Sequence, residues 1–401
     1  MSEHESDPFV RCLPSKPEHL RGDSRRLCGS IPIAEFKHAN RGRGKDNPMP
    51  VIHDKVAQLS NGAHYTYLDT GAPEGVSNYR TVIFIHGTAH NKCNTPSYCR
   101  QLISVTFEPC LQVTPKGFRG ISMSLRGMNG STPFSTEEAE CKVTPSQLHK
   151  TNIADFAAFL EYVGTKLGVP KRSNDGTGGI TNVHWSKGCA VATGLFYYMK
   201  DNPSYRDLVD KYVSSVVCYE PPTSAVIGID PGDCANGLFY HRLANPPEDP
   251  GLMFAKYVTG FYHNSPEYLA NKGGPQCTEY YRAGALEPDF QQYREKGYEG
   301  EYLPAILHWF LEDQEEDRME ACHKAFQEMA ASSVKKIGLL WGADGPPECL
   351  EGSWIIEKWL EEESKKTGEV KVATKQYPGG NHYIQFYHPA GFWKAILEIS
   401  V

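Results

Sequence analysis

The sequence lacks any stretch of about 18 consecutive apolar residues, the length that a membrane-spanning helix requires. Its first residues also lack the charged start and apolar run of a secretory signal peptide. These two absences predict a soluble, cytoplasmic protein without a membrane span. With a formal net charge of -7 and no basic stripe, the chain shows no signal for nucleic-acid binding. A small molecule is therefore the expected partner, and the oligomeric state is left open, with a homodimer as one option.

Paired metal-ligand spacings are absent as well. The chain has 12 cysteines, but none of them forms a Cys-x-x-Cys pair, and no Cys/His spacing typical of zinc sites occurs. Without a signal peptide, free thiols are the expected state of these cysteines. We therefore predict no disulfide framework, no metal and no cofactor.

Apolar runs and helical segments alternate along most of the chain. Runs that suit strands of a buried parallel sheet lie at residues 81–85, 118–123, 180–185, 212–219, 337–341 and 369–373. Segments with helical spacing of apolar residues lie between them, at 151–167, 189–199 and 353–363. This alternation predicts an α/β protein with a mostly parallel central sheet and helices on both faces.

The alternation of strand-like runs and helical segments is interrupted in two places. Residues 1–55 are polar and rich in Arg, Pro and Gly, and we interpret them as an N-terminal arm. Residues 222–333 are first rich in Pro, Gly and Tyr and then acidic, which indicates one long, mainly helical insertion that forms a cap. The core is then predicted to comprise residues 56–221 and 334–401.

Ser186 is the candidate nucleophile. It follows the apolar run at 180–185 and precedes a helical segment, so it occupies a strand-to-helix turn. Such a turn is sharp, and small residues are expected two positions before and after the serine. Gly188 meets this expectation, whereas His184 stands where the other small residue is expected.

A serine nucleophile needs a base and a group that orients the base. His382 follows a Gly-Gly pair beyond the last predicted strand and is the candidate base. Asp344 follows the run at 337–341 and is the first candidate for the acid. Glu220 also follows a predicted strand, and it is the reserve candidate.

The backbone N–H groups of two further residues could bind an oxyanion. Thr88 follows His86-Gly87 at the end of the first buried run, and Lys187 follows the candidate nucleophile. Donors at these two places would stabilise the negative charge that develops in acyl transfer.

In their order along the chain, these segments resemble those of the α/β-hydrolase family. The matching stretches are Tyr67-Leu68-Asp69-Thr70-Gly71, Phe84-Ile85-His86-Gly87, Ser124 to Ser131, Val183 to Cys189, Trp341 to Asp344, and Gly379 to His382. The stretch from Ser124 resembles the family's Asp-x-Arg-Gly-His-Gly-x-Ser but lacks its Asp and His. The resemblance implies the α/β-hydrolase fold, with the cap inserted after strand 6, and a Ser186, Asp344, His382 triad in the family's order.

The cap insertion is rich in Phe, Tyr and Trp, which favours a medium-sized, largely apolar or aromatic substrate. The residues expected to contact it are His86, Trp185, Tyr257 and Tyr262. The predicted activity is hydrolysis of an ester or lactone, or of a thioester, through an acyl-enzyme. Two alternatives remain open: a non-hydrolytic lyase or cyclase on the same scaffold, and a ligand-binding protein derived from a disabled hydrolase.

Overall fold

The computed structural model describes eight parts of the chain: residues 53–87, 107–128, 130–139, 142–229, 257–273, 279–282, 316–369 and 371–401. All of them belong to the compact unit formed by residues 49–401. The predicted N-terminal arm therefore lies almost entirely outside the described residues. None of the described helices combines the length and the apolar character that a membrane crossing requires.

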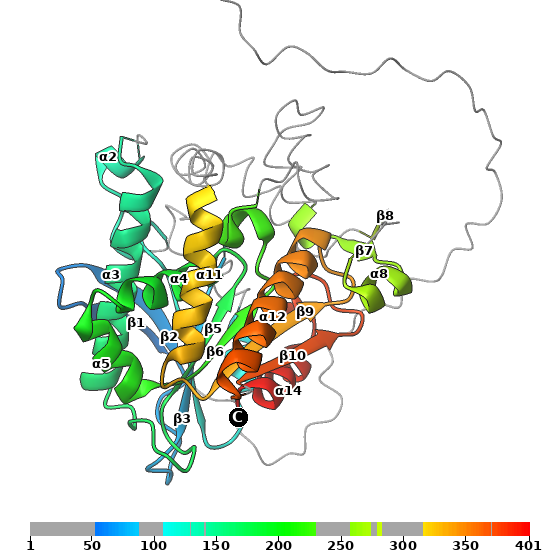
Figure 1. Ribbon diagram of the computed structural model, residues 1–401. Coiled ribbons are helices and arrows are strands. Elements are labelled where there is room, and N and C mark those ends of the chain that lie inside the picture. Colours follow the sequence, from blue (N-terminus) through cyan, green and yellow to red (C-terminus); the bar gives the residue numbers. More distant parts are fainter. Residues whose placement is uncertain are drawn as a thin grey trace, which may run out of the picture. The chain divides into compact units, whose positions relative to one another are not determined.

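A sheet of eight strands forms the centre of this unit (Figure 1). In spatial order the strands are β1 (His53–Gln58), β2 (His64–Asp69), β4 (Phe118–Met123), β3 (Arg80–Ile85), β5 (Ile180–Trp185), β6 (Val213–Tyr219), β9 (Lys336–Gly342) and β10 (Val372–Tyr377). The pairs β1–β2 and β2–β4 are antiparallel, and all other neighbours are parallel. The predicted mostly parallel sheet is thus confirmed.

The central strands are apolar on both faces because helices cover both sides of the sheet. In β3, Ile83 and Ile85 face one hydrophobic core, while Val82 and Phe84 face the other. Side chains alternate across a strand, so a continuous apolar run supplies both cores at once.

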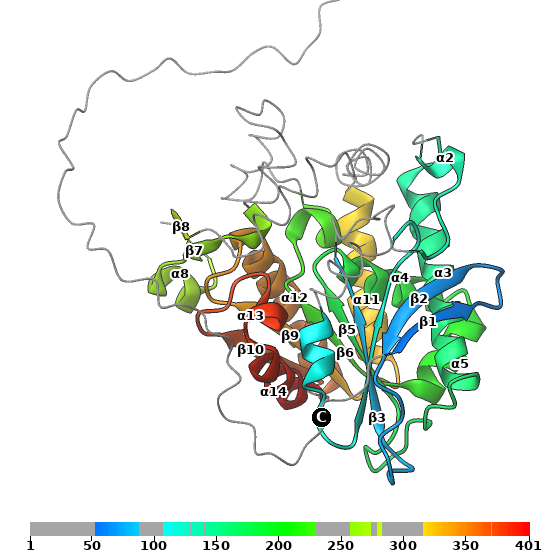
Figure 2. The same ribbon diagram turned by 180° about the vertical axis from the view of Figure 1, so that it is seen from behind.

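The helices lie in two layers (Figures 1 and 2). The first core is covered by α3 (Pro145–Thr165), α4 (Gly188–Met199), α5 (Pro203–Tyr212), α11 (Glu316–Ala331) and α12 (Pro347–Thr367). The second core is covered mainly by α14 (Pro389–Ser400), together with residues 107–111. Shorter helices are α2 (Thr136–Ala139), α8 (Pro266–Asn271) and α13 (Ile384–Tyr387).

The predicted cap is described only in pieces. These are η1 (Thr223–Ile227), the two-stranded pair β7 (Phe261–His263) and β8 (Glu279–Arg282), α8, and α11. Helix α11 packs against α4 and α12, so the end of the predicted insertion takes part in the helical layer over the sheet. The division into core and cap at 222 and 333 stays a prediction.

Two strands of the eight-stranded sheet differ from the sequence prediction. Strand β1 was not predicted, because its sequence His-Asp-Lys-Val-Ala-Gln is mostly polar. Strand β10 was predicted at 369–373 but spans Val372–Tyr377. Both are edge strands, and an edge strand needs no continuous apolar run. The five cysteines in the described part of the chain are buried free thiols: Cys110, Cys189, Cys218, Cys322 and Cys349.

Candidate active site

Ser186 occupies a sharp turn between β5 and α4. Its backbone has a φ of 55°, in the left-handed region that non-glycine residues rarely adopt. Two bonds hold this conformation: the Ser186 N–H donates to the carbonyl of Tyr219 at 2.8 Å, and its own carbonyl accepts from the Cys189 N–H at 2.9 Å. A residue kept in so unfavourable a conformation by its surroundings is typical of functional sites.

The turn requires glycine where the chain approaches it most closely. A Cβ on Gly188 would lie 2.6 Å from the carbonyl oxygen of His86. A Cβ on Gly87 would lie 2.6 Å from the Cβ of Ser186. The end of β3 therefore lies against the turn, which places the backbone of Gly87 beside the candidate nucleophile.

His184, the departure from the expected small residue, is accommodated below the turn. Its ring is buried, packs edge-on against Phe156 with centroids 5.4 Å apart, and has Nδ1 3.0 Å from the carbonyl oxygen of Gly188. Burial lowers the pKa of this imidazole to about 3. The ring is therefore neutral and serves to tie the strand to the start of α4.

His382 lies in the loop between β10 and α13. Its carbonyl accepts hydrogen bonds from the indole Nε1 of Trp185 at 3.0 Å and from the hydroxyl of Tyr219 at 2.8 Å. The rings of Trp185 and His382 have centroids 5.0 Å apart. Trp185 immediately precedes Ser186, so these contacts bring the histidine loop to the nucleophile turn.

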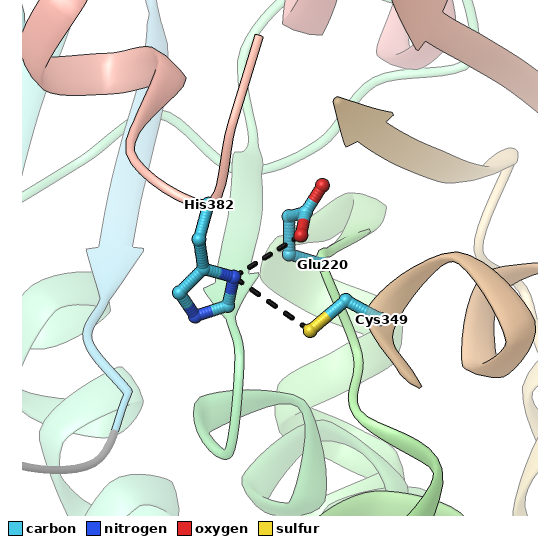
Figure 3. Close-up of side chains that lie close together, drawn as sticks. All are labelled: Glu220, Cys349 and His382. Atoms are coloured by element: carbon cyan, nitrogen blue, oxygen red, sulfur yellow. Dashed lines mark hydrogen bonds and ion pairs between the residues drawn. The ribbon is translucent and has the colours of Figure 1, made fainter. Parts of the chain in front are cut away.

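Glu220 supplies the carboxylate beside the histidine. Its Oε2 lies 3.1 Å from Nδ1 of His382, and both side chains are buried (Figure 3). Its Oε1 accepts the backbone N–H of Gly342. The backbone of Glu220 is itself left-handed, with a φ of 54°.

This geometry favours Glu220, the reserve candidate, over Asp344, whose role as the acid stays a prediction. Asp344 lies beyond β9, and its backbone joins two loops: its N–H donates to the carbonyl of Gly380 at 2.8 Å, and its carbonyl accepts from the N–H of Tyr262 at 3.0 Å. The carboxylate that reaches Nδ1 of His382 comes from Glu220, the reserve candidate. Because β6 and β9 are neighbours, both acids follow strand ends at the same edge of the sheet, and sequence position could not distinguish them.

Among the described residues, no hydrogen bond joins the hydroxyl of Ser186 to His382. Trp185 connects the two residues: its indole N–H donates a hydrogen bond to the carbonyl of His382, and it directly precedes Ser186 in the chain. Hydrogen bonds of a catalytic serine are often long without substrate and tighten when it binds. Nδ1 of His382 faces Glu220, so Nε2 is the ring nitrogen that this contact leaves available.

One of the two predicted oxyanion donors, Thr88, lies outside the described residues. The other, Lys187, lines a cavity of about 60 Å³ together with His86, Gly87 and Arg126. Burial of the Lys187 ammonium, with a smaller contribution from the positive charge of Arg318, lowers its pKa to about 7.

The four predicted substrate contacts have different surroundings. His86 lines the cavity, yet its ring is buried, accepts the N–H of Leu125 on Nε2 at 3.0 Å, and has a pKa lowered to about 4 by burial. Trp185 is buried beneath His382.

Tyr257 and Tyr262 pack on each other with ring centroids 5.8 Å apart, and the hydroxyl of Tyr262 donates to the carbonyl of Tyr257 at 2.8 Å. Substrate contact by these four residues stays a prediction.

Two residues of the site gave no usable signal in the sequence. Cys349, near the start of α12, places its Sγ 3.7 Å from Nδ1 of His382. Asn381 is fully buried, and its amide donates to the carbonyls of Thr259 and Gly260 at 2.8 and 3.2 Å, which anchors the histidine loop. The position of Asn381 directly before the candidate base is the only hint that the sequence offers.

Comparisons with known proteins define the fold. No protein-family model and no curated protein matches the chain. The solved structure of an esterase, RhEst1 from Rhodococcus sp. ECU1013, is 15% identical, with a TM-score of 0.52 over 86% of this chain and 97% of that chain. The chain has the α/β-hydrolase fold, as the sequence predicted.

Two further solved structures are similar at lower scores. The haloalkane dehalogenase DbeA from Bradyrhizobium elkani USDA94 is 17% identical, with a TM-score of 0.47 over 87% of this chain and 96% of that chain. A serine hydrolase involved in carbazole degradation is 12% identical, with a TM-score of 0.45 over 87% of this chain and 98% of that chain.

Proposed function

We propose that the protein is a serine hydrolase that cleaves an ester or lactone of a medium-sized, largely apolar or aromatic molecule. The observation that carries this proposal is a serine in a strained strand-to-helix turn whose neighbouring loop holds a buried His–Glu pair. Nucleophile, base and orienting acid are the three groups that acyl transfer requires.

In the proposed mechanism, His382 accepts the proton of the Ser186 hydroxyl on Nε2 while Oγ attacks the carbonyl carbon. Glu220 accepts a hydrogen bond from Nδ1–H of His382, which fixes the tautomer and stabilises the imidazolium that forms. His382 then returns the proton to the leaving oxygen, and an acyl-enzyme remains on Ser186. Water, deprotonated by His382, releases the acid in the second half of the reaction.

The oxyanion of the tetrahedral intermediate needs fixed donors. We assign this role to the backbone N–H groups of Lys187 and Thr88. Support comes from Gly87, which lies against Ser186 and directly precedes Thr88 in the sequence.

Steady-state turnover of a series of aryl esters and aryl lactones tests this function. The wild type should release the phenol, and Ser186→Ala should reduce kcat by about 10⁶-fold, because the nucleophile is removed. Ser186→Cys serves as a matched variant that keeps a nucleophile of similar size. Equal turnover by wild type and Ser186→Ala would contradict the proposal.

A further inference from the structure

Cys349 adds a third ligand-type atom to the Glu220–His382 pair. Its Sγ lies 3.7 Å from Nδ1 of His382, whose distance to Oε2 of Glu220 is 3.1 Å (Figure 3). One ligand atom from each of the three residues lies within 4.8 Å of the other two, and all three side chains are buried. They come from three places in the fold: the end of β6, the start of α12 and the loop after β10.

The two separations from Nδ1 of His382 fit a small tetrahedral metal ion, three of whose four positions these residues would occupy. Zinc is bound at about 2.0–2.3 Å by nitrogen, oxygen and sulfur, so two of its ligand atoms lie roughly 3.3–3.6 Å apart. The observed N···O and N···S distances of 3.1 and 3.7 Å differ from this range by a few tenths of an ångström at most. A zinc ion could therefore be bound by small side-chain adjustments.

The charges also fit a divalent ion of borderline softness. Burial and the carboxylates of Glu220 and Glu348 raise the pKa of the Cys349 thiol, so the thiol keeps its proton until a metal ion displaces it. Once that proton has left, a carboxylate and a thiolate contribute two negative charges and a neutral imidazole adds none, so these three ligands balance a divalent cation. Neutrality matters at a place this buried, because an uncompensated charge there is strongly unfavourable. A mixed N, S and O ligand set suits zinc, whereas Mg²⁺ and Ca²⁺ prefer oxygen ligands alone.

We propose that Glu220, Cys349 and His382 form an inhibitory zinc site within the acid–base pair. The effect on activity rests on the proposed hydrolase function, whereas the binding itself does not. Zinc binds Oε2 of Glu220, the thiolate of Cys349 and Nδ1 of His382. The thiol proton leaves to solvent, and the ring proton of His382 passes from Nδ1 to Nε2 by exchange with water. One proton is released for each zinc bound.

Zinc binding and catalysis exclude each other because both use the same imidazole. With zinc on Nδ1, the Nε2 atom carries the ring proton and can no longer accept the proton of Ser186. Glu220 is also withdrawn from the hydrogen bond that orients the ring. The site therefore acts as a switch that turns the base off without touching the nucleophile.

The binding is tested by titrating zinc into the full chain and following the heat of binding. Wild type and Ser186→Ala should bind with equal affinity, since Ser186 is not a ligand. Cys349→Ser keeps the size of the side chain but replaces the thiolate, and its dissociation constant should rise roughly 100-fold or more, because even outer-shell partners contribute 10–100-fold. Cobalt should give a thiolate charge-transfer band with wild type that Cys349→Ser lacks.

Inhibition is followed as the ratio of ester turnover with and without zinc in each variant. This ratio should fall for wild type, recover on addition of a chelator, and stay near one for Cys349→Ser at the same zinc concentration. Cys349→Ala repeats the comparison in case a buried serine hydroxyl unfolds the protein, and circular dichroism monitors folding of both variants.

The outcomes separate the two proposals. Zinc binding to wild type that is unchanged in both Cys349 variants would place the metal elsewhere and overturn the site. Absence of zinc binding to wild type would also overturn it. Thiolate-dependent binding to a protein that hydrolyses no ester would support the site while the hydrolase proposal failed. Ester hydrolysis that zinc does not affect would support the hydrolase proposal and overturn the inhibitory zinc site.

Discussion

The ends of β6 and β9 lie side by side and each carries an acid, yet they differ in what that acid does. Glu220, after β6, is fully buried, and its carboxylate contacts His382 and the backbone N–H of Gly342. Asp344, after β9, is less buried, and its backbone bonds link the loop to Gly380 and Tyr262.

The comparison indicates that side-chain length and backbone conformation determine which of the two acids contacts His382. The histidine loop follows β10, which is separated from β6 by β9. Glu220 bridges this distance with a side chain one methylene longer than that of aspartate and with a left-handed backbone. The end of β9, which lies nearer, instead holds the histidine loop by a hydrogen bond from the Asp344 N–H to the Gly380 carbonyl.

The largest expected effect comes from exchanging each acid for its amide. Glu220→Gln should lower kcat/KM for an aryl ester by about 10⁴-fold, because the amide cannot stabilise the imidazolium. Asp344→Asn, the matched control, should stay within about threefold of wild type, as for a substitution that removes no contact of the transition state. The reverse pattern would identify Asp344 as the acid.

A smaller effect is expected from crowding the Glu220 carboxylate. A Cβ on Gly345 would lie 3.0 Å from both of its oxygens, so Gly345→Ala should displace the acid and lower kcat roughly tenfold. The control is Gly338→Ala, whose Cβ would meet Ile399 at 2.9 Å and Val217 at 3.0 Å in the core. It should lower the unfolding midpoint while leaving the kcat of the folded protein near wild type. Equal kcat losses in both variants would mean that the effect is general crowding.

The smallest expected effect is on the pH dependence of folding stability, and it comes from the charge of Lys187, the residue after Ser186. Lys187 has a pKa of about 7 in the folded protein against an ordinary 10.5, because burial and Arg318 disfavour its charge. The unfolded chain therefore binds more protons between these two values, and folding stability from this group rises with pH across that window. Urea unfolding of wild type relative to Lys187→Met should show this rise. A pH-independent difference would contradict the buried placement of the ammonium.

The fold could be predicted because its central strands are covered on both faces. The runs at 81–85, 118–123 and 180–185 are observed as strands within one residue of the predicted ends. Edge strands are exposed on one side and carry polar residues, so β1 was missed and β10 was shifted. The position of Ser186 followed from the same pattern, since a turn that joins a buried strand to a helix has few alternatives.

Which carboxylate faces His382, and the presence of Cys349 beside it, could not be predicted in this way. Both depend on the register of neighbouring strands and on which side chain turns toward the histidine loop. Cys349 lies 33 residues from His382 and is brought to it only by the packing of α12 beside β9 and β10. Spacing patterns in a sequence reveal metal ligands only when the ligands belong to one local motif. Glu220, Cys349 and His382 are far apart in the sequence and share no such motif.

In the proposed mechanism, Ser186 is the nucleophile that forms an acyl-enzyme. This role is tested most directly by reacting the protein with a fluorophosphonate and locating the adduct by peptide mass spectrometry. We expect a single adduct on Ser186 in wild type, much slower labelling of Glu220→Gln and none in folded Ser186→Ala. An unlabelled but folded wild type, or equal labelling of Ser186→Ala, would contradict this role.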